Sequence, residues 1–169
     1  MRRIVLALAL AGSTFTHARA ESPPPNKAEL AGKVLALTIG GKTYSLSKSA
    51  VYHQGSVVEI HFDQPSADGN TQLWIIPSAG TDGRTFTVKG SGMDALFLQL
   101  DKPPKRGDNV SNDCRASGTL TFDKTPEPGK PTSGAVDVTI TCRRVPQIPE
   151  PIVVRGKFAD VPYVKPSGG

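Results

Sequence analysis

Two stretches decide the fold of this chain: CRASGTLTF at residues 114–122 and AVDVTITC at residues 135–142. In both, apolar and polar residues alternate with a period of two, which indicates a β-strand with one buried face. The predicted strands are Gly118–Phe122 and Ala135–Cys142, and the segment between them is rich in proline and glycine, which predicts a turn. The two stretches are therefore expected to pair as an antiparallel hairpin whose far end carries the chain's two cysteines.

One register of this hairpin satisfies the hydrophobic pattern and the cysteines together. Leu120 then lies opposite Val136, and Cys114 lies opposite Cys142. Directly opposed residues in a non-hydrogen-bonded pair come close enough for a disulfide. We therefore predict a Cys114–Cys142 disulfide, which stabilises the fold by about 3–4 kcal/mol in the chain-entropy description.

The first 20 residues are typical of a secretory signal peptide. Arg2 and Arg3 precede an apolar run at residues 4–11, and Ala18-Arg19-Ala20 provides small residues at a cleavage site. The run is far shorter than the ~20 residues that span a bilayer. We expect a periplasmic or secreted protein with no membrane span, in a compartment where a pair of cysteines oxidises.

Removal of this segment changes the charge of the protein. The 169-residue chain has 20 Lys and Arg against 15 Asp and Glu, and loss of Arg2, Arg3 and Arg19 leaves 17 basic residues among the remaining 149. All 15 acidic residues remain, so basic and acidic residues are nearly equal in number, and the composition no longer supports a nucleic-acid partner. The length suits one ordinary domain.

The chain is expected to have one folded unit between two loose ends. The predicted parts are a signal peptide at 1–20, a proline-rich disordered lead-in at 21–27, a single β domain at 28–165 and a flexible tail at 166–169.

A second hairpin is predicted around Gly40-Gly41, because two glycines accept the positive φ angles of a tight turn. Pairing residues 34–39 with residues 42–46 puts Leu37 opposite Tyr44 and makes one face of the hairpin apolar.

Further short strands are predicted at residues 58–62, 73–76, 85–88, 95–100 and 152–158. About eight short strands with turns between them favour an all-β fold, namely an antiparallel β-sandwich with one disulfide. A small β-barrel is the alternative.

Several finer expectations accompany this fold. Residues 95–100 are apolar on both sides and are expected to form a central strand, whereas residues 47–52 weakly indicate a helical turn. Long loops are expected at 63–71 and 101–113, as connections between sheets. Trp74, among apolar neighbours, is expected in the core.

The small number of histidines argues against catalysis that depends on a histidine. After cleavage only His53 and His61 remain, and no pattern ties either of them to a nucleophile. His61 is expected on the outward face of its strand, beside Glu59 and Asp63, as a surface histidine. We therefore predict no catalytic residues, no metal site and no cofactor, and the protein is interpreted as a non-enzyme.

Basic residues are expected to gather around the disulfide. Its formation brings Arg115, Arg143 and Arg144 to one end of the hairpin, and the segment with Lys105 and Arg106 leads into that end. Such a cluster attracts phosphate or carboxylate groups. Ordinary solvated charge at the end of a sheet is the competing interpretation.

These features predict a non-catalytic exported binding module that acts on a macromolecular partner at the cell envelope. The identity of the partner is left open by the sequence, and one hypothesis is a protein partner, with inhibition of a secreted hydrolase through the 101–113 loop. The alternative is an anionic envelope polymer, lipopolysaccharide or peptidoglycan, bound by the basic cluster. An enzyme of unrecognised type that uses His53 or His61 is the third hypothesis.

Overall fold

The computed structural model describes residues 26–54, 57–66, 69–78, 80, 82–100, 110–145, 148 and 150–164. The predicted signal peptide at 1–20 and tail at 166–169 lie outside the described residues, as does most of the lead-in. Those predictions stay predictions.

The hairpin around which the fold is built consists of β9 (Cys114–Phe122) and β10 (Pro131–Cys142). Leu120 pairs with Val136, and Cys114 pairs with Cys142, so the predicted register is confirmed. The two cysteines form a disulfide, with their Cα atoms 3.9 Å apart. Beyond them, the Arg143 N–H donates to the Asp113 carbonyl at 2.8 Å, which makes the cysteines a non-hydrogen-bonded pair.

Seven strands form the larger half of the structure, in the spatial order β3-β2-β1-β11-β10-β9-β7. The strands that join β9 and β10 in this seven-strand half are β1 (Lys27–Gly32), β2 (Val34–Ile39), β3 (Lys42–Leu46), β7 (Thr85–Ser91) and β11 (Ile152–Val164). The hairpin around Gly40-Gly41 has the predicted register, with Leu37 opposite Tyr44.

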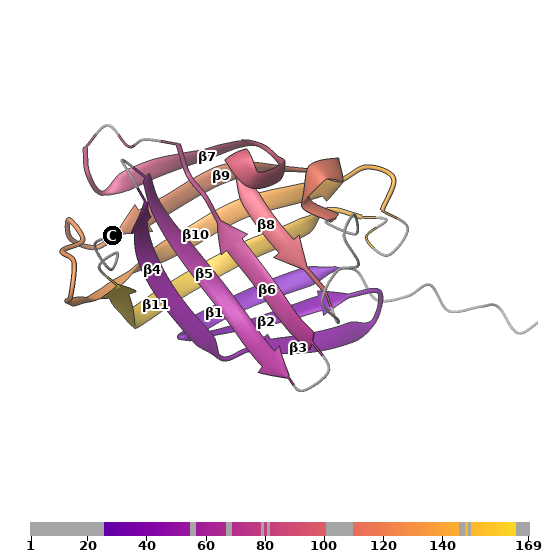
Figure 1. The fold of residues 1–169 in the computed structure, drawn as a ribbon, viewed down its shortest axis with the longest axis horizontal. Helices are drawn as coiled ribbons and strands as arrows, with labels where there is room; N and C mark the ends of the chain where they lie inside the picture. The colour runs from indigo at the N-terminus through magenta and orange to yellow at the C-terminus, as the bar shows by residue number, and fades with distance from the viewer. Residues whose placement is uncertain are drawn as a thin grey trace, which may run out of the picture.

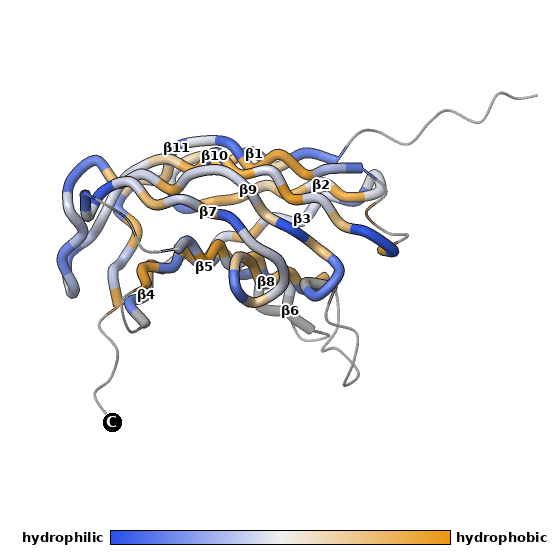
Figure 2. The backbone as a smooth tube through the Cα atoms, turned by 90° about the horizontal axis from the view of Figure 1, so that it is seen from above, coloured by the Kyte–Doolittle hydropathy of each residue, from blue (hydrophilic) through white to orange (hydrophobic). Residues whose placement is uncertain are grey.

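The smaller half has four strands, in the order β4-β5-β6-β8. These strands are β4 (Lys48–Gln54), β5 (Val57–Ser66), β6 (Gly69–Ile75) and β8 (Leu96–Gln99). Two short 3-10 helices, η1 (Gly92–Asp94) and η2 (Val110–Asp113), precede β8 and β9. The four-strand half lies across one face of the seven-strand half (Figures 1 and 2).

The all-β class and the disulfide are confirmed, but a sandwich of two separate antiparallel sheets is not. The eleven strands of the described residues form one mixed sheet, because Tyr163 and Val164 at the end of β11 pair in parallel with Val51 and Tyr52 of β4. The strand β11 also pairs in parallel with β1. The sheet stays open, so it is not the alternative barrel either. The physical reason is the length of β11, whose 13 residues serve both halves.

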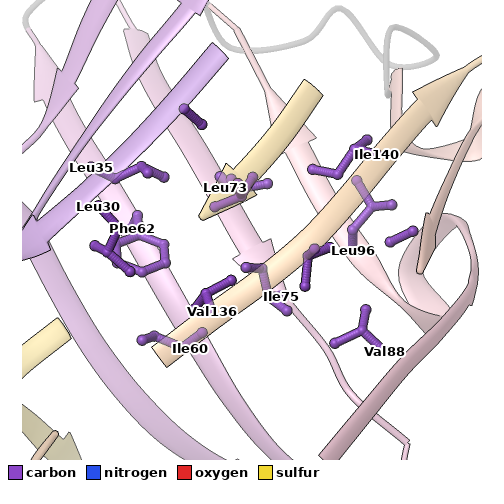
Figure 3. Close-up of a cluster of buried hydrophobic side chains, with 14 of the residues drawn as sticks. Leu30, Leu35, Ile60, Phe62, Leu73, Ile75, Val88, Leu96, Val136 and Ile140 are labelled. Carbon is purple, nitrogen blue, oxygen red and sulfur yellow. The ribbon is translucent and has the colours of Figure 1, made fainter. Parts of the chain in front are cut away.

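The core lies between the two halves. Inward side chains from both contribute to it, including Leu30, Phe62, Leu73 and Val136 (Figure 3). Three buried phenylalanines are in contact in this core. The ring of Phe122 packs edge-to-face against Phe86, at 5.7 Å between ring centroids, and against Phe158, at 5.6 Å.

Three local predictions are wrong, and one strand was not predicted. The helical turn at residues 47–52 is part of β4, since pairing with β5 overrides a weak local signal. The predicted loop at 63–71 is largely the ends of β5 and β6. Residues 95–100 do not form a central strand, because β8 ends the pairing path. Strand β1 was not expected.

At three positions the backbone of a neighbouring strand lies so close that only glycine, which has no Cβ, fits. A Cβ on Gly156 would lie 2.1 Å from the Leu30 carbonyl oxygen, and Gly118 and Gly134 show the same conflict with β10 and β9. Gly156 also has a φ of +153°, which only glycine adopts readily. The parallel pairing of β1 with β11 therefore depends on the missing side chain at Gly156.

We expect Gly156→Ala to lower the free energy of unfolding by at least about 3 kcal/mol, since it combines backbone strain with a clash. Gly32→Ala is the matched control, because Gly32 also has a positive φ but has open space around its Cβ position. We expect it to cost only about 1 kcal/mol. Urea denaturation measures both values, and equal costs would contradict the close approach of β11 to β1.

Candidate functional site

The three predicted arginines lie at the disulfide end of the β9–β10 hairpin. Arg115 follows Cys114 on β9, and Arg143 and Arg144 follow Cys142 after the end of β10. All three side chains are exposed. Arg144 has a φ of +63°, so the chain turns sharply there. Lys105 and Arg106, the other predicted members of the cluster, lie outside the described residues.

Two other cations on the same half of the molecule are paired with acids. Arg155 binds Asp137 through two hydrogen bonds of 3.0 and 3.1 Å, and Lys27 pairs with Glu29 at 3.2 Å. Within the described parts of the chain, no carboxylate forms an ion pair with Arg115, Arg143 or Arg144. We define these three residues as the arginine cluster.

A second group of functional side chains lies on the outer face of the four-strand half. His61 is on the predicted side of β5, and its Nε2 lies 2.9 Å from Glu59 Oε2. The prediction of a surface histidine is wrong, however, because only 13% of the side chain is exposed. Its ring stacks on Trp74 with centroids 4.2 Å apart and planes 5° apart.

Trp74 belongs to this outer face and not to the core. Its neighbours Leu73 and Ile75 point inward and are fully buried. Trp74 points the other way, and its Nε1 donates to Asp63 Oδ1 at 3.3 Å. The sequence pattern could not show this, because apolar residues occupy both faces of β6 at this point.

An aromatic row thus crosses the four strands: Tyr52, His61, Trp74 and Phe97. The centroids of successive rings lie 4.5, 4.2 and 4.5 Å apart. Both faces of the Trp74 ring contact another ring of the row, so a flat ligand such as a sugar cannot stack on them. The row therefore acts first as a brace that ties β4, β5, β6 and β8 together.

The histidines show no arrangement typical of catalysis in the described residues. The His53 ring lies 6.4 Å from the Tyr163 ring, and His61 contacts Glu59, Tyr52 and Trp74. A search of the described ranges finds no group of three His, Cys, Asp or Glu side chains placed to hold a metal ion. The predicted absence of an enzyme activity, a metal and a cofactor stays a prediction.

A cavity of 420 Å³ lies under the loop that joins β9 to β10, at the end of the hairpin opposite the disulfide. Glu127 and Lys130 on its wall form an ion pair, and the hydrogen bond from Lys130 lowers the pKa of Glu127. The Gly129 N–H fixes the loop to the Tyr163 carbonyl at 2.9 Å. Glu127 and Lys130 are thus already paired with each other. The other two charged residues of the wall, Asp123 and Lys124, have opposite signs, so the lining has no net charge to attract an ion.

Comparisons with known proteins give no match: no family model, no curated protein and no solved structure is similar to this chain. In the described residues, no helix has the length and apolar character needed to cross a membrane. The arginine cluster and the aromatic row are therefore the features of this chain that bear on its function.

We expect His61 and Trp74 to stabilise the fold through each other. In a double-mutant cycle of His61→Ala and Trp74→Ala, the stacked rings are expected to show a coupling energy of about 0.5–1.5 kcal/mol. Thermal or urea unfolding of the four proteins measures it. A coupling energy near zero would contradict the role of the aromatic row as a brace.

Proposed function

We propose that this chain is a non-catalytic exported binding module that holds an anionic polymer of the cell envelope, lipopolysaccharide or peptidoglycan, through the arginine cluster. The observation that supports this proposal is that three exposed arginines lie at one end of the hairpin and that, among the residues the structure describes, no carboxylate is paired with them. By contrast, Arg155 on β11 of the same half is paired with Asp137 through two hydrogen bonds.

The chemistry of guanidinium groups suits such a ligand. Each presents planar pairs of N–H donors that bind a phosphate or carboxylate through two parallel hydrogen bonds. Arg115 pairs across the ladder with Thr141, so Arg143 is its diagonal neighbour, at roughly 7–8 Å between backbones. Groups at this distance lie within one Debye length and act on a polyanion together.

The disulfide holds the backbone beside Arg115 and Arg143 rigid. Cys114 and Cys142 join the two strands one residue before Arg115 and one residue before Arg143. The backbone positions of the arginines are therefore set before a ligand arrives, which reduces the entropy lost on binding.

The hypothesis of a hydrolase inhibitor has less support. It depends on the loop at 101–113, of which residues 101–109 lie outside the described residues and residues 110–113 contain η2. This hypothesis stays a prediction, and retention of a specific envelope protein in a pull-down would favour it.

The proposal is tested by binding to vesicles that contain lipopolysaccharide and to isolated peptidoglycan at several salt concentrations. We expect the affinity to fall steeply as salt rises, because binding displaces counterions from the polymer. The double variant Arg143→Glu/Arg144→Glu should bind at least about 100-fold more weakly, since charge reversal replaces attraction with repulsion.

The control is Lys33→Glu/Lys124→Glu, which makes the same change in net charge at the opposite end of the seven-strand half. Both lysines are exposed. We expect the control to retain most of the affinity. Equal loss in the two double variants would show that only net charge matters, and salt-independent binding would overturn the proposal.

A further inference from the structure

The arginine cluster continues onto the outer face of three strands. The registers of β7, β9 and β10 align the outward residues in rows across these strands. From the disulfide end, the rows are Ser91–Arg115–Thr141, then Lys89–Ser117–Thr139, then Thr87–Thr119–Asp137.

The nine side chains of these rows are mostly hydrogen-bond donors. Six of the nine side chains carry a hydroxyl group, two are cations, and one is a carboxylate. That carboxylate, Asp137, is occupied by Arg155. These nine positions therefore carry two positive groups and six hydroxyl groups, and their one acid is already paired. A further acid at the disulfide end is the exposed Asp113, whose carbonyl accepts the hydrogen bond from the Arg143 N–H, so among the described residues the cations still outnumber the acids at this end.

We propose that this face is a phosphate-binding track, which extends the anion site from the arginine cluster through Arg115 to Lys89 and the hydroxyl rows. This inference rests on the proposed function and makes its ligand specific. The groups bound on the track are the phosphoryl groups of lipopolysaccharide.

The surroundings of Arg115 favour phosphate over carboxylate. Arg115 has Ser91 on one side and Thr141 on the other, each directly opposite it on a neighbouring strand, about 5 Å away between Cβ atoms. A carboxylate has two oxygens, and one guanidinium engages both of them through two parallel hydrogen bonds. A phosphate has three strong acceptor oxygens, so the guanidinium and the flanking hydroxyls can all donate to it.

The spacing of the two cations also suits a ligand with several phosphates. Lys89 pairs with Ser117 and Arg115 pairs with Ser91, so the two cations are diagonal neighbours at roughly 7–8 Å between backbones. Arg143 continues the same direction beyond Thr141, because its N–H adds one more rung to the ladder. Phosphoryl groups carried on one molecule can therefore contact more than one cation at a time.

The backbone under this face is rigid. The residues that alternate with the track, among them Val88, Ala116, Leu120 and Ile140, are buried in the core. The strand β9 is paired on both sides, by β7 and by β10. The donors are thus held in fixed rows, as recognition of a patterned anion requires.

The experiment uses vesicles that contain lipopolysaccharide and matched vesicles with enzymatically dephosphorylated lipopolysaccharide. The full mature chain is compared with Lys89→Gln and with Ser117→Ala/Thr139→Val. We expect about tenfold weaker binding and a shallower salt dependence for Lys89→Gln. The hydroxyl variant should lose about threefold to tenfold in affinity with an unchanged salt dependence, because it removes donors and no charge.

Lys33→Gln is the control for the loss of one charge, and circular dichroism with thermal unfolding checks that each variant is folded. If Arg143→Glu/Arg144→Glu abolishes binding while Lys89→Gln and the hydroxyl variant bind like the parent, the track is wrong and the proposed function stands. Unchanged binding after dephosphorylation also overturns the track. If none of the variants changes binding, both proposals fail.

Discussion

The covalent pairing of Cys114 with Cys142 is the constraint on which the rest of the structure depends. It joins β9 and β10 at one end, in the register that also buries Leu120 and Val136 on the same face. A shift of one residue would turn the buried side chains of one strand toward solvent. The covalent bond and the hydrophobic pattern require the same alignment of the two strands, so both stabilise the same native register.

The same register determines both faces of the seven-strand half. On the inner face it places Phe122 against Phe86 and Phe158, and on the outer face it places Arg115 beside Thr141 and Ser91. The long strand β11 then carries the chain to the four-strand half, where the aromatic row braces the opposite surface. Binding chemistry and core packing therefore come from one alternation of residues along β9 and β10.

The sequence was informative where pairing is local. The β9–β10 and β2–β3 hairpins follow from alternation and turn residues, and the arginine cluster follows because its members adjoin the cysteines. Strand β1 was missed because KAELAG is rich in residues that favour helices, which hid its local antiparallel pairing with β2. Its other partner, on β11, lies more than 120 residues away. No local pattern reports a parallel partner at that distance. Lys89 was not predicted as a binding residue, because only the non-local pairing of β7 with β9 brings it beside Arg115.

Trp74 illustrates a different limit. In the run Leu73-Trp74-Ile75-Ile76 both faces of the strand are apolar, so alternation cannot separate inward from outward residues. Only the pairing of β6 with β5 places Trp74 beside His61, on the outside. Favourable stacking and a hydrogen bond to Asp63 then keep a large aromatic ring out of the core.

The register of β9 against β10 is tested most directly by nuclear Overhauser contacts between Hα protons across the hairpin. In a non-hydrogen-bonded pair these protons are close, and the alternation that starts at Cys114–Cys142 makes Ala116–Ile140 and Leu120–Val136 pairs of the same kind. Strong Hα–Hα contacts are expected at both pairs in the oxidised protein. Contacts displaced by one or more residues would contradict the register, and with it the gathering of the arginines at one end.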